Sequence, residues 1–250
     1  EFLSEFARKA SLLDESDKLY KTLFNSISHE LRITVAAIMG AADSLKDSDL
    51  SIELRRELYG EIFIASVRLN RLIENLLNMS RLESGRLSLR KDWYDLNDLF
   101  YQVCENLKDE LSSHNLDTEI QDDLPLVKID FGILGQVLHN LILNAIQHTP
   151  AGTEIKLLAQ FSDSTLSISV SDNGSGFPTD AVSNVFDKFN KAGKSGGGGP
   201  GLGLSIVKGF TEAHGGEVLA GNNHNGGATV RIKLPVEFSD IKSLKISIDE

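Results

Sequence analysis

Cysteine, long apolar runs and positive charge are all scarce in this sequence. Cys104 is the one cysteine among 250 residues, so no internal disulfide can form and a reducing compartment is expected. No apolar run approaches the roughly 20 residues that a membrane-spanning helix needs. The chain starts with Glu1 and shows no signal peptide. We therefore expect a fragment whose missing part could have carried a sensor or membrane spans.

The charge balance limits the partners. The chain has 25 lysines and arginines against 36 acidic residues, a formal net charge of −11. A general nucleic-acid binder needs a basic face, and this composition argues against one. A polyphosphate ligand would need local cations or a metal ion. The length predicts one or two domains, and an apolar fraction of 41% is enough for a core.

Two long helical patterns occupy residues 1–46 and 52–83, and residues 46–51 form a polar turn between them. In both patterns apolar residues recur at steps of three and four, which places them on one helix face. The result is an antiparallel hairpin. One hairpin cannot cover both stripes, so we expect a homodimeric four-helix bundle; packing against the rest of the same chain is the alternative. The stripes comprise Phe6, Ala10, Leu13, Tyr20, Phe24, Ile27, Leu31, Ile38, Ala41 and Leu45, interrupted at Asp17 and Thr34, then Leu54, Leu58, Ile62, Ala65, Leu69, Leu72, Leu76 and Met79.

A break at residues 84–86 ends the hairpin, so the first domain is expected to span residues 1–85. After a linker at 86–92, residues 93–237 predict an α+β sandwich with a mixed sheet and helices on one face, followed by a tail at 238–250. Strands are expected at residues 87–91, 116–120, 127–129, 153–161, 165–171, 217–220 and 228–234. Helices are expected at 96–111, with Asp95 as the cap, at 131–148 and at 202–214.

His29 lies outside the apolar stripe. It is two residues from both Ile27 and Leu31, so it points away from that face, and an imidazole exposed to water is nucleophilic near neutral pH. The adjacent Glu30 could take or hold the ring proton. Taken alone, His29 is better interpreted as an ordinary surface histidine; the motifs downstream change that interpretation.

Two polar motifs in the second domain suit a nucleotide, although each also has an ordinary structural interpretation. Asn140 and Asn144 share one helix face, and their amide oxygens suit Mg²⁺. Residues 172–176, Asp-Asn-Gly-Ser-Gly, follow an apolar strand. The carboxylate could accept a hydrogen bond from an exocyclic amine, and the glycines would let the backbone approach a flat ring. The alternatives are surface asparagines and a strand-ending turn.

A glycine-rich stretch at residues 193–203 leads directly into a helix. Glycines before a helix N-terminus favour phosphate binding, and Lys188, Lys191 and Lys194 add local positive charge. A flexible linker is the alternative, disfavoured because folded elements lie on both sides. No P-loop motif is present. Phe186 and Phe189 either anchor one end of this loop or belong to the core.

In this order, the motifs resemble those of the sensor histidine kinases of two-component systems. Residues 28–32 resemble the phosphoacceptor box and residues 140–144 the asparagine box. Residues 172–176, 186–189 and 199–204 resemble the remaining boxes of the ATP-binding domain. The resemblance covers residues 20–236. It implies a dimeric hairpin, a Bergerat (GHKL-type) α/β sandwich, ATP, Mg²⁺, a cytoplasmic location and transfer of a phosphoryl group from histidine to the receiver domain of a response regulator.

The resemblance also implies residue roles. His29 would be the phosphorylated residue, Glu30 the adjacent acid or base, and Asn144 the metal ligand. Asp172 would read adenine. Gln147 and His148 stand where the family often has a lysine and a tyrosine. The other implied nucleotide contacts are Asn140, Gly174, Gly176, Lys191 (where an arginine is frequent), Gly199, Gly201, Leu202, Gly203 and Leu204.

Two departures from the family pattern carry expectations. The family commonly reads His-Glu-Leu-Arg-Thr-Pro, whereas this chain has Ile33 and Thr34 at the last two positions. Without proline the helix should run straighter. In the family, the hydroxyl of the threonine at the position of Ile33 helps to place the water that dephosphorylates the regulator. Ile33 therefore predicts weak phosphatase activity with kinase activity retained. Pro200 removes one amide donor from the glycine-rich loop.

Two other functions stay open from the sequence. A nucleotide-binding pseudokinase or scaffold without phosphotransfer would fit Ile33-Thr34 and the missing lysine, but not the retention of His29, Glu30 and Asn144. An ATPase related to chaperones or topoisomerases would share the nucleotide fold but not the phosphoacceptor hairpin. The stimulus and the identity of the regulator are not encoded in these motifs.

Overall fold

The computed structural model describes residues 25–47, 49–85, 87–188, 201–224 and 226–239. The chain divides into two compact units, Glu1–Leu77 and Asn78–Glu250. Among the described residues, no helix is both long enough and apolar enough to cross a bilayer.

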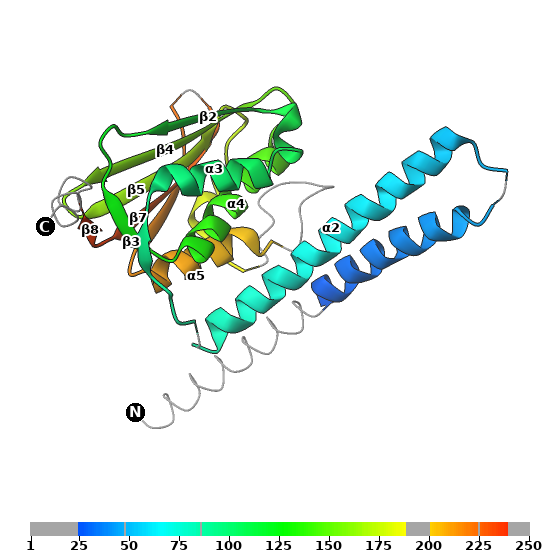
Figure 1. Ribbon diagram of the computed structural model, residues 1–250, viewed down its shortest axis with the longest axis horizontal. Helices are drawn as coiled ribbons and strands as arrows, with labels where there is room; N and C mark the ends of the chain where they lie inside the picture. The colour runs from blue at the N-terminus through cyan, green and yellow to red at the C-terminus, as the bar shows by residue number, and fades with distance from the viewer. Residues whose placement is uncertain (1–24, 48, 86, 189–200, 225, 240–250) are drawn as a thin grey trace, which may run out of the picture. The chain divides into compact units, whose positions relative to one another are not determined.

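The first unit is a helical hairpin (Figure 1). Residues 25–44 are helical, without a break at Ile33 or Thr34. The second helix, α2, spans Ile52–Glu83, and its first turn is capped by Ser51, whose hydroxyl accepts the Leu54 N–H at 3.1 Å. It ends before Gly85, which has the positive φ of 62° that glycine readily adopts after a helix. The predicted hairpin and the limits of its second helix are confirmed.

The apolar seam of the hairpin follows much of the predicted stripe among the described residues. Ile27, Ala41 and Leu72 are buried. Thr34 was expected to interrupt the stripe, yet it is only 2% exposed, and its hydroxyl donates to the Glu30 carbonyl at 2.8 Å. That bond satisfies the hydroxyl inside the seam. The part of the first stripe before residue 25 lies outside the described residues.

The hairpin also leaves a second apolar surface uncovered. Leu54, although part of the predicted stripe, is 42% exposed. An apolar surface of this extent is typical of an interaction site. Its large side chains are Ile33, Val35, Met39, Ile52, Leu54, Tyr59, Phe63, Ile64, Val67, Ile73 and Leu77.

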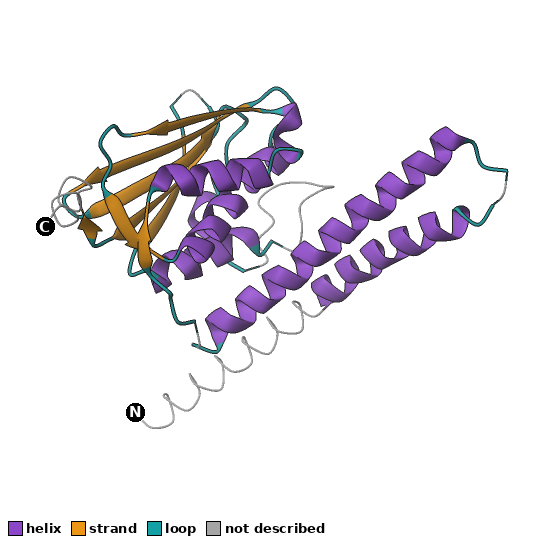
Figure 2. Ribbon diagram, in the orientation of Figure 1, coloured by secondary structure: helices purple, strands orange, loops and turns teal. Residues whose placement is uncertain are grey.

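The second unit contains the expected mixed sheet with helices on one face (Figure 2). The strand order is β2-β4-β5-β7-β6; β2 runs parallel to β4, and the other neighbours are antiparallel. These strands are β2 Asn115–Ile120, β4 Glu154–Ser162, β5 Thr165–Asp172, β6 Glu217–Asn222 and β7 Ala228–Pro235. The helices are α3 Leu96–Asn106, α4 Phe131–His148 and α5 Gly203–Ala213.

Alternation along the central strands builds the core between sheet and helices. Ile155 and Leu157 of β4 and Ile168 of β5 are fully buried and face the helix layer, where Ile142 and Phe210 are buried as well. One residue in two on each strand therefore faces the helices, which is the pattern of a sheet covered on one side. The limits of α4 agree with the predicted helix at 131–148.

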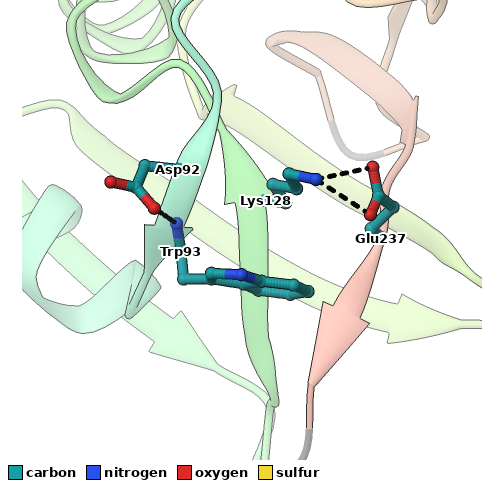
Figure 3. Close-up of polar contacts among 4 residues, drawn as sticks. All are labelled: Asp92, Trp93, Lys128 and Glu237. Atoms are coloured by element: carbon teal, nitrogen blue, oxygen red, sulfur yellow. Dashed lines mark hydrogen bonds and ion pairs between the residues drawn. The ribbon is translucent and has the colours of Figure 1, made fainter.

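A small second sheet corrects two predictions. It consists of β1 Asp92–Tyr94, β3 Leu126–Ile129 and β8 Phe238–Ser239. No strand forms at residues 87–91, because pairing with β3 begins only at Asp92. β8 lies within the predicted tail and pairs with β3. An ion pair at 3.0 Å between Lys128 of β3 and Glu237, which directly precedes β8, adds to this contact (Figure 3).

The helix that begins after Asp95 is shorter than expected. Asp95 caps it as predicted, accepting the Asn97 N–H at 2.8 Å. However, α3 ends at Asn106, and Leu111 falls in a separate 3₁₀ turn, Glu110–Ser113.

Candidate functional site

The end of α4, the end of β5 and the start of β7 together form a pocket in the second unit. Asp130 fixes the start of α4 by accepting the Ile133 N–H at 3.0 Å. The buried face of α4 then places Asn144 toward the sheet. The pocket encloses about 210 Å³ of empty space, including its open mouth. It is lined by Leu141, Asn144, Ala145, Val170, Asp172, Phe177, Ala228 and Val230.

Asp172 is the acidic group of this pocket. It ends β5, and its Oδ1 accepts the backbone N–H groups of Gly174 at 2.9 Å and of Ala228 at 3.2 Å. Both bonds fall on one oxygen, and an ionised carboxylate can accept through the other as well. Around it the pocket is apolar, since Leu141, Val170 and Val230 are almost fully buried. A carboxylate among apolar walls is the chemistry that recognises a flat ring with an amine edge.

The glycines after Asp172 are required by neighbouring protein atoms. A Cβ on Gly174 would lie 2.6 Å from Cγ2 of Thr149. At Gly176, where φ is +74°, a Cβ would lie 2.7 Å from Oδ1 of Asn222. The loop is therefore packed tightly against neighbouring protein atoms. This packing requires glycine independently of the expected approach of a flat ring to the backbone.

The two asparagines of α4 differ in depth. Asn144 is half-buried and lines the pocket. Asn140 is only 5% exposed, and its side-chain Nδ2 is buried without a hydrogen-bond partner among the described residues. Gln147 and His148 are exposed at the C-terminal end of α4. Desolvation lowers the pKa of His148, and the nearby Asp172 opposes that shift.

The glycine-rich segment is described only in part. Gly201 has a φ of +73°, Leu202 is 1% exposed, and α5 begins at Gly203 followed by Leu204. No side chain caps this helix start, so its first N–H groups suit an anionic ligand. Lys191, Lys194, Phe189, Gly199 and Pro200 lie outside the described residues. Lys188, expected to supply free positive charge, pairs with Glu83 at 2.8 Å.

In the first unit, His29 is exposed as predicted. Glu30 turns toward α2 instead: its side chain is 10% exposed, and Oε2 accepts a hydrogen bond from Nη2 of Arg68 at 3.0 Å. The structure thus adds a cation to the expected histidine–acid pair. No local sequence pattern indicates this contact, because Arg68 is 38 residues away from Glu30.

Several pocket residues were also missed by sequence reasoning. Phe177 follows the glycine motif, and Ala228 and Val230 belong to β7. Their contribution depends on the pairing of β5 with β7, where Val170 lies opposite Val230. Only the alternation of β7 could have indicated that Val230 faces inward.

Two family models match the chain. The model of the His Kinase A (phospho-acceptor) domain matches residues 20–85. The model of the histidine kinase-, DNA gyrase B- and HSP90-like ATPase matches residues 130–238. The two matches fall on the hairpin and on the sandwich that contains the pocket.

Curated relatives match both regions together. The sensor protein KdpD of Clostridium acetobutylicum is 31% identical over 243 residues, which cover 95% of this chain and 27% of that protein. The sensor protein DivL of Caulobacter vibrioides is 32% identical, covering 93% of this chain and 30% of its own length. The chain therefore spans less than a third of these relatives.

Solved structures show the same arrangement of elements. Full-length ShkA in complex with AMPPNP has a TM-score of 0.65 at 27% identity, covering 87% of this chain and 46% of that one. The histidine kinase ThkA in complex with the response regulator protein TrrA also has a TM-score of 0.65, at 24% identity, covering 90% of this chain and 64% of that one. The second is a likeness of fold alone.

Proposed function

Because the chain belongs to the sensor histidine kinase family of two-component systems, we propose that it uses ATP to phosphorylate its own His29 and passes the phosphoryl group to an aspartate of a response regulator. The proposal is supported by the presence in one chain of an exposed His29 on the hairpin and of an apolar pocket in the second unit that presents Asp172 and Asn144. Neither a pseudokinase nor a simple ATPase needs both.

The transfer is an in-line displacement. A ring nitrogen of His29 attacks the γ-phosphorus of ATP, a P–N bond forms, and the bond to the β–γ bridging oxygen breaks to release ADP. The protein contributes mainly by positioning the reactants and stabilising charge. The ring proton must leave, and Glu30 is the adjacent acceptor, a role worth about 10²–10⁴-fold. Arg68 contacts the Glu30 carboxylate at 3.0 Å and so orients it.

The residues of the pocket fit the rest of the substrate. Asp172 would accept a hydrogen bond from the exocyclic amine of adenine. Asn140, one turn before Asn144, has a buried Nδ2 without a partner among the described residues. Asn144 would hold Mg²⁺ through its amide oxygen, since magnesium commonly keeps several waters and binds substrate phosphates. When bound, the ion neutralises phosphate charge.

The uncovered apolar surface of the hairpin supports a second copy of the chain as partner. It draws on both helices of the hairpin and includes Phe63 and Ile64, which are 69% and 68% exposed. We place this homodimer in the cytoplasm, with a response regulator as its phosphoryl acceptor.

Labelling with γ-³²P-ATP and a magnesium salt tests the proposal. The wild-type chain should acquire an acid-labile label, which His29→Gln should abolish. His224→Gln, which alters another exposed histidine, should leave the label intact. A label that persists in His29→Gln would refute the assignment. Nucleotide binding without any label would favour the pseudokinase, and steady phosphate release without a phosphoprotein would favour the ATPase.

A further inference from the structure

The turn between β6 and β7 lies against the loop that follows Asp172, and none of the motifs used above includes it. Asn222 ends β6. Its Oδ1 accepts the Phe177 N–H at 2.7 Å, and its Nδ2 donates to the Phe177 carbonyl at 2.8 Å. One amide therefore takes up both backbone groups of a pocket residue, as a neighbouring strand would.

Asn223 makes a corresponding contact with the end of β5. Its Nδ2 donates to the Asp172 carbonyl at 3.1 Å and to the Ala228 carbonyl at 3.3 Å. Its Oδ1 accepts the hydroxyl of Thr229. This half-buried amide thus joins the backbone of Asp172 to the start of β7, and the Ala228 N–H in turn donates to the Asp172 carboxylate.

Backbone contacts bring Gly227 close to the end of β5. Gly227 has a φ of +85°, and a Cβ on it would lie 2.0 Å from the carbonyl oxygen of Asp172. The N–H of Asn223 donates to the Gly227 carbonyl at 2.9 Å. Asn223 and Gly227 therefore contact each other and the backbone of Asp172.

We propose that Asn222 and Asn223 are positioning residues that determine the base selectivity of the pocket. The proposal rests on the proposed function, because it takes the pocket to bind adenine. A carboxylate discriminates an amine from a carbonyl only while it is held in place. It accepts a hydrogen bond from the exocyclic amine of adenine, and it repels the carbonyl oxygen that guanine carries at the same ring position. Without the two amides, Asp172 and Phe177 gain freedom, and discrimination weakens while contacts to the phosphates remain.

The test measures binding alone, by titration calorimetry of the full chain with ADP and with GDP. Asn223→Ala should weaken ADP binding by about tenfold and reduce the ADP-over-GDP preference by a similar factor, as expected for the loss of hydrogen bonds around a buried reader. Asn97→Ala, which alters an exposed asparagine at the start of α3, is the matched control and should change neither value. Circular dichroism and thermal melting confirm that each variant is folded.

If Asn223→Ala does not fold, Asn222→Ala provides the same comparison, since it releases only the backbone of Phe177. A folded variant that retains the wild-type preference within about twofold overturns the proposal, because discrimination then does not depend on the amide. A loss of ADP and GDP binding in equal proportion also overturns it. Failure of the wild type to label His29, with ADP preference intact, would refute the kinase reaction while leaving this inference standing.

Discussion

Burial and hydrogen bonding determine what individual polar side chains can do in this fold. Asn144 lines the pocket, whereas Asn140, one turn earlier on α4, is only 5% exposed. Thr34 is buried in the seam of the hairpin, where its hydroxyl donates to the Glu30 carbonyl.

Ile33 provides a prediction at this scale. It is 47% exposed and lies one turn from His29. An aliphatic side chain cannot orient a hydrolytic water by hydrogen bonding. Ile33→Thr should therefore increase hydrolysis of the phosphorylated regulator several-fold while His29 labelling continues, as measured by loss of label from purified phosphorylated regulator. Ile33→Val is the control without a hydroxyl. Fast hydrolysis by the wild type, unchanged in Ile33→Thr, would remove the basis for this expectation.

His214 predicts acid sensitivity of the second unit. It is 4% exposed, its Nδ1 donates to the Phe210 carbonyl at 2.8 Å, and its Nε2 is buried without a partner among the described residues. Burial, the main cause, lowers its pKa from 6.5. Below pH 6.5 the unfolded chain binds the proton more readily than the folded chain does, so the free energy of unfolding should fall as the pH decreases.

Urea unfolding over a pH series checks this expectation. Between about pH 7 and pH 5, the free energy of unfolding should change less steeply with pH in His214→Gln than in the wild type. The reason is that one of the groups that bind protons on unfolding has been removed. Asp and Glu residues contribute to both curves alike. Parallel curves would show that His214 does not titrate differently on unfolding.

Individual elements show why some boundaries can be predicted and others cannot. α2 and α4 were predicted well because periodicity, capping residues and glycine are all local signals. β1 and β8 are defined by pairing with β3, and a strand of two or three residues has no local period to detect. The pocket residues divide in the same way: Asp172 and Asn144 belong to local motifs, whereas Ala228 and Val230 line the pocket because β7 pairs with the distant β5.

The contact between the two helices of the hairpin carries a prediction of its own. Arg68 of α2 pairs with Glu30, whose side chain is 10% exposed. Arg68→Met should lower the free energy of unfolding by about 1–3 kcal/mol, between the values for exposed and buried pairs, because Glu30 loses its cation. Arg68→Lys keeps the charge and should lose less. Chemical denaturation monitors both, and equal stability of all three chains would show that the pair contributes nothing.

At the scale of the whole molecule, dimerisation follows from the apolar surface that one hairpin leaves exposed. Phe63 lies within it at 69% exposure. Phe63→Glu should convert a dimer into a monomer, because burying an unpaired carboxylate at an interface is costly. Light scattering after size exclusion would show the change in mass. Glu61→Lys, a charge change at another exposed position of α2, is the control; a wild-type monomer would contradict the expectation directly.

ATP held beside Asp172 should be the source of the phosphoryl group on His29. Mass spectrometry at neutral pH, after incubation with ATP and Mg²⁺, locates the phosphorylated residue. We expect phosphate on His29 in the wild type and none in folded Asp172→Asn, in which an amide replaces the carboxylate that reads the nucleotide. Phosphate on another residue, or undiminished phosphate on His29 in Asp172→Asn, would refute the proposed reaction.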